Sequence, residues 1–362
     1  MKGLLKRLGA FTKRYERHLS TAFFVAGFVG DIIAFTLLDV TVVSALFAAY
    51  IILGALAILG SHYLFSNQEA LPKARNFLTL GLPLFVQYIL GSTLSGALIF
   101  YTKSSVLTVS WPFILLLATV FFGNEIFRNY RDHLAFQTTL FFFGFYIYLI
   151  FELPLLIKHL GLWVFALTSA IAIGTFLIFL FTLYKVGEKR FKESVKKIAL
   201  SSVGIVVLVS SAYVTGLIPP IPLALKEGAI FHHVTKIAGG YEIADEASRP
   251  WWEFWDDTVH VSPGESLYAY SAVYAPISFD TTIVHRWEYY DTQKEAWVER
   301  SRLAFMVSGG RTQGYRGYSI RQNPEAGKWR VYIETPGGQV LGKLSFDVVR
   351  VNAPVLLHTE YR

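Results

Sequence analysis

Cysteine is absent from the 362 residues of this chain. Its absence excludes disulfide bonds, thiol nucleophiles, thiolate zinc sites and iron–sulfur clusters. Charge is also scarce, because 16% of the residues are charged whereas 53% are hydrophobic. This balance is too apolar for an ordinary soluble protein and indicates a membrane protein.

Long apolar runs fill the first 222 residues and then stop. A bilayer core of roughly 30 Å needs about 20 apolar residues per helix, and lipid offers no partner for backbone groups, so such runs must be helical. The runs are Thr21–Leu38, Val42–Phe65, Phe77–Tyr101, Val106–Phe122, Ala135–Ile157, Gly161–Val186 and Leu200–Ile221. We therefore predict an all-α bundle of about seven transmembrane helices over residues 21–222, with the first run retained rather than cleaved.

Lysine and arginine are concentrated in every second loop of this half. Sixteen of them precede helix one or lie between helices two and three, four and five, or six and seven, whereas the other loops hold only Lys103 and Lys158. Positive loops stay in the cytoplasm. The N-terminus is therefore expected in the cytoplasm, and seven crossings would deliver residues 223–362 to the opposite side of the membrane.

The net charge of +7 at first indicates a nucleic-acid partner. Divided by region, residues 1–222 carry +9 and residues 223–362 carry −2, so the excess belongs to the membrane half and nucleic-acid binding is not expected. Residues 1–20 place apolar side chains at helical spacing between basic ones. They form either an amphipathic helix on the cytoplasmic leaflet or an ordinary positive leader.

Small residues recur at every fourth position in two of the predicted helices: Ala166, Ala170 and Gly174 in helix six, and Ser92 and Gly96 in helix three. Such rows allow close approach of helices. They do not separate contacts within one chain from contacts between chains, so oligomerisation stays open.

The apolar period changes to two in residues 223–362. Trp329, Val331 and Ile333 alternate with polar residues, and Trp297, Leu303, Phe305 and Val307 share one parity. Further strands are expected at Ala229–Lys236, Thr258–Val261, Ser266–Ala275, Thr281–Tyr290, Tyr315–Arg321 and Gly342–Val348, with a hairpin turn at Pro336–Gly338. These features predict an all-β, sandwich-like soluble domain that needs no disulfide at this size.

Several short runs near the C-terminus carry a family resemblance: Val284–Trp287, Tyr315–Ser319, Gly327–Val331 and Gly338–Gly342, followed by Phe346. In order and spacing they resemble a bacterial domain-of-unknown-function family, number 2914. The membrane half is similar to a companion domain, also of unknown function. The resemblance implies an envelope protein of Gram-negative bacteria and supplies no catalytic residues.

Asp31 is the one acid near the middle of a predicted span. An ionised carboxylate at that depth costs several kcal/mol unless it is paired. We expect it to be protonated and structural, and the alternative is a proton or cation site with a neutral partner such as Gln87, Tyr88 or Tyr146.

The remaining polar groups are weaker candidates for catalysis or metal binding. His62 with Ser92 or Ser95 is only loosely suggestive of an intramembrane serine protease. Glu152 with His159, and Asn124 with Arg128, are interpreted as solvated helix ends. His232, His233, His260 and His285 have no spacing typical of a metal motif, so neither a metal nor a cofactor is expected.

Two surfaces of the soluble domain are candidates for recognition. Trp251, Trp252 and Trp255 belong to an aromatic cluster that rests on the outer bilayer surface or fills the domain core. The second set of candidate binding residues is Arg286, Arg316, Tyr318, Arg330 and Tyr332. Strand parity turns Arg330 and Tyr332 outward, whereas in the strand Thr281–Tyr290 either Arg286 with Glu288 or His285 with Trp287 could face out. Alternatively, these arginines pair with Glu288, Glu299 and Glu334 and only solvate the sheet.

The leading hypothesis is therefore non-enzymatic. It describes an inner-membrane protein, in contact with the lipid bilayer, whose periplasmic β-sandwich binds an envelope glycan, another envelope component or a periplasmic protein. The alternative is a membrane-embedded enzyme or transporter subunit that acts on a lipid or glycan carrier. The alternative requires converging charged groups within the spans, and the sequence offers only Asp31.

Overall fold

The structure is a computed structural model that describes residues 28–33, 40–67, 75–104, 107–126, 133–219, 223–238, 240–246, 258–275, 280–307 and 314–362. Two compact units are present. The first contains the helices, and the second contains all the strands, from Gly216 to Arg362, together with the short segments 104–111 and 154–161.

The first unit is helical over most of the predicted spans. Its helices are α2 (Val40–Ser66), α3 (Arg75–Ser104), α4 (Leu107–Ile126), α5 (Leu134–Ile157), α6 (Leu162–Val186) and α7 (Glu188–Val214). In the described part of the chain, five of them are long and apolar enough to cross a membrane, and the apolar part of α4, Ser110–Asn124, is shorter. Of the first predicted span, residues 28–33 are described, and they are helical.

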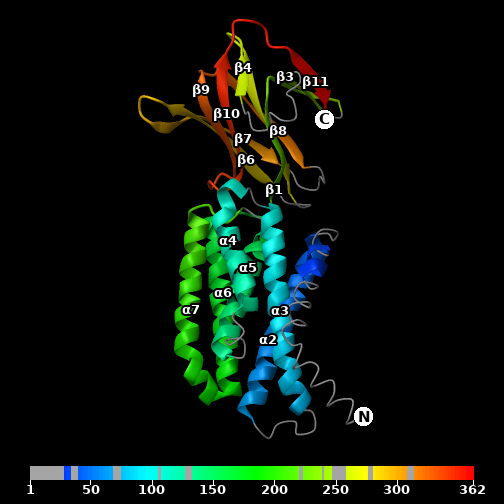
Figure 1. Ribbon diagram of the computed structural model, residues 1–362, viewed down its shortest axis with the longest axis vertical. Helices are drawn as coiled ribbons and strands as arrows, with labels where there is room; N and C mark the ends of the chain where they lie inside the picture. The colour runs from blue at the N-terminus through cyan, green and yellow to red at the C-terminus, as the bar shows by residue number, and fades with distance from the viewer. Residues whose placement is uncertain are drawn as a thin grey trace. The chain divides into compact units, whose positions relative to one another are not determined.

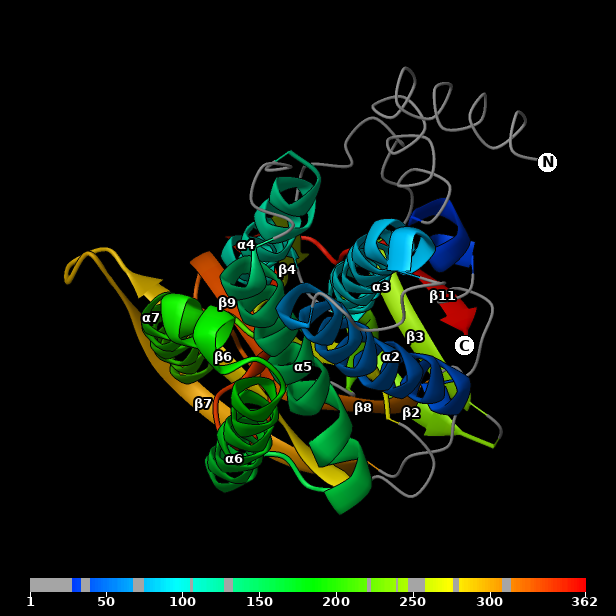
Figure 2. The ribbon, with the colours of Figure 1, turned by 90° about the horizontal axis from the view of Figure 1, so that it is seen from below.

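Aromatic side chains join α5, α6 and α7, which run side by side in the bundle (Figure 1, Figure 2). Phe142 stacks on Phe176 with ring centroids 4.2 Å apart. Phe165 stacks on Tyr213 at 3.9 Å. These contacts bury one stripe of α6, and the opposite side of that helix is exposed.

The predicted small-residue row of α6 lies on that exposed side. Ala166, Ala170 and Gly174 are exposed, and a Cβ added to Gly174 would meet nothing within 4 Å. Within the described part of the chain this row therefore does not pack against a neighbouring helix, because the larger Val164, Phe165 and Phe176 fill the buried stripe, and a contact between chains stays a prediction. In α3 the predicted residues Ser92 and Gly96 are buried.

Helix α7 begins earlier than its apolar run. The basic residues 189–197 were predicted to lie in a loop, but they form the first turns of α7, and Gly187 alone separates α6 from α7. Lysine, arginine and glutamate are good helix formers, so the helix continues through the polar segment. It ends at Thr215, which is followed by Gly216 at φ +74°.

The described strands of the second unit form three sheets, and Figure 1 shows how these strands are arranged. The five-stranded sheet has the order β4 (Thr258–Val261), β10 (Val340–Arg350), β9 (Gly327–Glu334), β6 (Thr281–Asp291) and β7 (Ala296–Val307). A three-stranded sheet has the order β1 (Ala224–Phe231), β5 (Ser266–Tyr274) and β8 (Tyr315–Gln322), and a second one has β11 (Leu357–Tyr361), β3 (Gly240–Glu246) and β2 (His233–Ile237).

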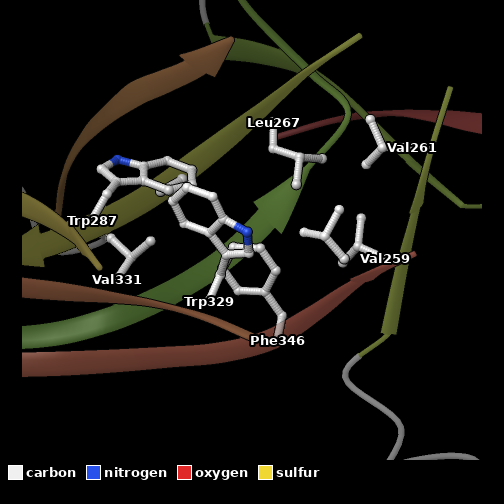
Figure 3. Close-up of a cluster of buried hydrophobic side chains, with 9 residues drawn as sticks. Val259, Val261, Leu267, Trp287, Trp329, Val331 and Phe346 are labelled. Carbon is white, nitrogen blue, oxygen red and sulfur yellow. The ribbon is translucent and has the colours of Figure 1, made fainter. Parts of the chain in front are cut away.

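The core of this unit lies between the five-stranded sheet and the β1-β5-β8 sheet. Trp287 and Trp329 are fully buried there with ring centroids 6.3 Å apart, and Leu267 and Ala269 of β5 complete the cluster (Figure 3). The sandwich prediction is therefore confirmed in these two sheets. A smaller cluster around Phe231, Ile243 and Tyr270 packs the third sheet against the other side of β5.

The strands differ from expectation in three respects. The expected strand Ala229–Lys236 is interrupted at His232, where β1 ends and β2 begins. Strands β3 and β11 were not predicted. Strand β4 pairs with β10 in parallel, whereas the other pairs are antiparallel. The predicted hairpin turn joins β9 to β10, with the Gly338 amide donating to the Thr335 carbonyl at 2.9 Å and Gly338 at φ +82°.

Candidate functional site

A cluster of arginines, glutamates and aromatic rings lies on the face of the five-stranded sheet that is turned away from the core. Trp329 and Val331 point into the core, so Arg330 and Tyr332 point out. We name this set the arginine face; it consists of Arg286, Glu288, Trp297, Arg302, Arg330, Tyr332 and Glu334.

Strand pairing places these residues next to one another. Arg286 of β6 lies opposite Tyr332 of β9, and Glu288 lies opposite Arg330. On the other side of β6, Arg286 lies opposite Arg302 of β7. Neighbouring side chains on one face of a sheet interact directly, so this register brings three guanidinium groups together.

Two buried carboxylates hold those guanidinium groups. The side chain of Glu334 is 1% exposed and accepts hydrogen bonds from Arg286 Nη2 at 3.0 Å and from Arg302 Nη2 at 2.7 Å. Glu288, 8% exposed, accepts from Arg330 Nε at 2.5 Å and also pairs with Arg286. A buried carboxylate needs such partners because its charge is otherwise costly.

Aromatic rings support the guanidinium groups from the side. The Arg330 guanidinium carbon lies 4.0 Å from the ring centroid of Trp297, and that of Arg286 lies 4.4 Å from the centroid of Tyr332. Burial lowers the pKa of Arg330, and the positive charge of Arg286 adds to that effect. Arginine stays protonated through such a shift, so the face keeps its three positive charges.

Trp297 reaches this face because of a β-bulge. Trp287 pairs with Ser301 but Glu288 pairs with Glu299, so Arg300 is an extra residue in β7. One extra residue reverses the alternation of side chains that precede it. The expectation that Trp297 shares the face of Phe305 and Val307 is therefore wrong, and the sequence pattern could not reveal this ring as part of the site.

The predicted binding residues fall on two different sheets. Arg286, Arg330 and Tyr332 lie together on the arginine face. Arg316 and Tyr318 belong to β8, where Tyr318 packs between Tyr241 and Tyr268 beside the third sheet. The structure therefore divides the five predicted residues into a group of three and a separate pair.

The remaining predicted residues do not join this face. Trp251, Trp252 and Trp255 lie outside the described residues. Asp31 belongs to the helical unit, where it is 6% exposed.

Two expectations about helix ends are wrong. Glu152 and Asn124 are not solvated, since they are 9% and 4% exposed. Glu152 accepts a hydrogen bond from Ser44 Oγ at 2.6 Å. Burial is tolerable for such a carboxyl because neighbouring helices supply a partner.

His62 makes no hydrogen bond to Ser95 in the described part of the chain. Its Nε2 is 3.0 Å from the carbonyl oxygen of Leu183 at the end of α6. Its Nδ1 and the Ser95 hydroxyl are each buried without a hydrogen bond, so they do not bond each other. A catalytic pair needs such a bond, and the geometry therefore gives no support to a protease built on His62 and Ser95.

The histidines of the second unit, which we call the β-unit, have structural partners. His285 is fully buried between Ser271 of β5 and Ser319 of β8, at 2.8 and 2.9 Å. His232 and His260 both contact Glu246, at 3.3 and 3.0 Å. Among the described residues, no group of three or more histidine, aspartate or glutamate side chains is arranged to hold a metal ion.

Comparison with known proteins identifies one family. Residues 280–348 match the family described as "Protein of unknown function (DUF2914)", and the match covers β6 to β9, most of β10 and all seven residues of the arginine face. The helical region before it is consistent with the companion domain expected upstream. No curated protein matches the chain.

Solved structures give weak likenesses. An immunoglobulin-like protein of Pseudomonas aeruginosa is 12% identical, with 35% of this chain and 96% of that chain covered and a TM-score of 0.21. A β-glucosidase of Listeria innocua in complex with isofagomine is 10% identical over 32% of this chain and 17% of that chain, with a TM-score of 0.18. Scores this low carry no argument about fold or function.

Proposed function

We propose that this chain is a multi-pass inner-membrane protein that keeps its N-terminus in the cytoplasm and holds its β-unit in the periplasm. Five long apolar helices support a membrane location. The loop asymmetry supports the orientation, and five of its basic residues lie in the first turns of α7, ahead of that helix's apolar part.

Reporter fusions test the orientation. Alkaline phosphatase fused after Arg362 should be active, and green fluorescent protein at the same position should be dark. The opposite pair of results would mean that the number of crossings is even, and it would place the β-unit in the cytoplasm.

The proposed activity is the binding of an anionic group, a carboxylate or a phosphate, carried by an envelope polymer or by a partner protein. One observation carries this proposal: the buried Glu288 and Glu334 hold three guanidinium groups against Trp297 and Tyr332. Guanidinium groups bind carboxylates and phosphates through paired N–H donors. Groups that are already ordered lose little entropy when they bind.

Donors remain available on this face. Arg330 uses Nε for Glu288, and none of the described residues accepts a hydrogen bond from its terminal nitrogens. The side chain of Arg302 is 49% exposed. Glu299 also pairs with Arg302, at 3.9 Å, so three arginines meet three glutamates, and the unused N–H donors rather than a net charge would attract an anion.

The competing interpretation is that the ion pairs only solvate the sheet. Burial of the two carboxylates argues against it, because exposed pairs could solvate a sheet without the desolvation cost that Glu334 incurs. The Arg302→Ala and Arg330→Ala double variant separates the two interpretations. It leaves Arg286 between Glu288 and Glu334, so neither buried carboxylate loses its last partner.

The full-length protein in lipid nanodiscs should be sedimented with purified peptidoglycan sacculi and, separately, with lipopolysaccharide vesicles. Binding to at least one of these probes is expected, with a loss of about tenfold in affinity in the double variant, equivalent to about 1.4 kcal/mol. Arg316→Ala is the matched control, because Arg316 lies on β8 and should leave binding unchanged. Equal binding by the double variant would contradict the proposed site.

A further inference from the structure

A group of oxygen-bearing side chains surrounds Asp31 inside the helical unit. The carboxyl of Asp31 is 6% exposed, and the hydroxyls of Tyr50 in α2 and Ser95 in α3 face it. Ser92 of α3 in turn faces the Tyr50 hydroxyl, and Tyr88 lies close to the same ring. The helical residues 28–33, α2 and α3 thus each contribute polar oxygens to one buried cluster.

The sequence of α3 explains this convergence. Tyr88, Ser92 and Ser95 follow one another at intervals of four and three residues, so they form one stripe along the helix. Helix α2 packs against α3 beside it, since a Cβ added to Gly54 would lie 3.2 Å from the Cγ2 methyl of Ile89. This packing brings Tyr50 of α2 to the serine stripe of α3.

Two of these oxygens have no hydrogen bond within the described part of the chain. They are Asp31 Oδ2 and Ser95 Oγ, and both residues are more than nine-tenths buried. Buried polar atoms without partners are rare in proteins and need an explanation. Protonation of Asp31 would remove its charge, but it would satisfy both atoms only if the two side chains moved into a hydrogen-bond geometry that they do not have here.

We propose that Asp31, Tyr50, Ser92 and Ser95 form a binding site for one monovalent metal cation, such as Na⁺, within the membrane-spanning unit. The ligands are all oxygens, which hard cations prefer. The site holds one carboxylate, so one monovalent cation makes it neutral, whereas a divalent cation would leave a charge in the membrane. The cation would supply the missing partner of both Asp31 Oδ2 and Ser95 Oγ.

The thermal stability of the purified full-length protein in nanodiscs tests this proposal. Sodium chloride should replace choline chloride stepwise at constant ionic strength and pH. The Tm of the wild type should rise with Na⁺ and approach saturation, because a ligand that binds the folded state stabilises it. Ser95→Ala should shift the midpoint to about tenfold higher Na⁺, and Asp31→Asn should abolish the rise.

Ser110→Ala is the matched control, because Ser110 Oγ in α4 is also buried without a hydrogen bond and should leave the Na⁺ dependence unchanged. Equal Tm in sodium and choline would overturn the proposal, as would a Na⁺ response that survives Asp31→Asn. A Tm that follows pH alone would show a proton site without a metal ion and would also overturn it. If Asp31→Asn does not fold, binding of radioactive sodium decides: about one ion per wild-type chain, and much weaker binding by Ser95→Ala.

Discussion

Trp287 of β6 donates its indole N–H to Ser319 Oγ of β8 at 2.9 Å, across the interior between the two sheets. Ser319 therefore has its own proton left for His285 Nδ1, which lies 2.9 Å away. His285 Nε2 then carries the proton of the neutral ring and donates it to Ser271 Oγ at 2.8 Å. One serine thus satisfies two aromatic side chains of the core.

Replacing Ser319 by alanine should destabilise the β-unit by about 2–3 kcal/mol, because the Trp287 N–H and the His285 ring nitrogen lose their shared partner in a dry interior. Urea unfolding followed by tryptophan fluorescence measures the change. Ser345→Ala is the control, since Ser345 is exposed on β10. Similar stabilities for the two variants would mean that water replaces the lost hydroxyl.

Burial also lowers the pKa of His285 to about 4 from 6.5. The folded state therefore favours the neutral ring, so its contribution is complete above pH 6.5 and is lost as the pH falls toward 4. The loss at the acid end should reach about 3 kcal/mol. Unfolding free energies measured between pH 7 and pH 4 should show this slope, and His285→Gln should flatten it. An equal slope in the variant would assign the effect to another group.

Glu246 should change the free energy of unfolding at lower pH than His285 does. Burial raises its pKa, but hydrogen bonds from His232 and His260 outweigh that effect and lower the pKa from 4.5 to about 2. Its contribution is present above pH 4.5 and is lost as the pH falls toward 2. Glu246→Gln should therefore remove part of the acid dependence below pH 4.5 and leave the His285 slope intact. A change confined to higher pH would contradict this assignment.

The β-unit should fold without the helices. A fragment containing residues Gly216–Arg362 retains all the strands and both tryptophans of the core. It should give a β-type circular dichroism spectrum and unfold cooperatively in urea. An aggregated product would show that the unit needs one of its two short segments; the first candidate is Pro154–Gly161, from which Leu160 packs against a core cluster.

Gly187 should be intolerant of a side chain. A Cβ there would lie 2.1 Å from Ser66 Oγ and 2.7 Å from His62 Nε2, closer than atoms can approach. Gly187→Ala should therefore lower the Tm of the full-length protein, with a cost of about 1–3 kcal/mol. Gly204→Ala in α7 is the control, because a Cβ there meets nothing within 4 Å. An unchanged Tm for Gly187→Ala would mean that the end of α2 moves aside freely.

Sequence patterns predicted the parts of this protein that are buried on one side. The alternation around Trp329 and Val331 located β9 and turned Arg330 and Tyr332 outward. Strands β3 and β11 escaped prediction because they carry no clear alternation: β11 is exposed along its whole length. A pattern of burial cannot appear where little is buried.

The composition of the arginine face was only partly predictable for another reason. Parity along a strand says which residues share a face, but it does not say which sheet the strand joins. Arg316 and Arg330 were both candidates for one binding surface, yet they belong to β8 and β9, which lie in different sheets. Trp297 was assigned to the wrong face because the bulge at Arg300 is visible only in the pairing of β6 with β7.

That bulge makes the chemistry of the face depend on the register of β7 as well as on the identity of its residues. If Arg300 instead paired with Glu288, the ladder would close without an extra residue, and every side chain from Ala296 to Glu299 would turn to the opposite side of the sheet. Trp297 would then leave Arg330, and Val298 would take its place. A one-residue slip in the pairing of β6 with β7 would thus exchange an aromatic platform for an aliphatic one without any change in sequence, whereas deletion of Arg300 would keep the present pairs and leave Trp297 where it is.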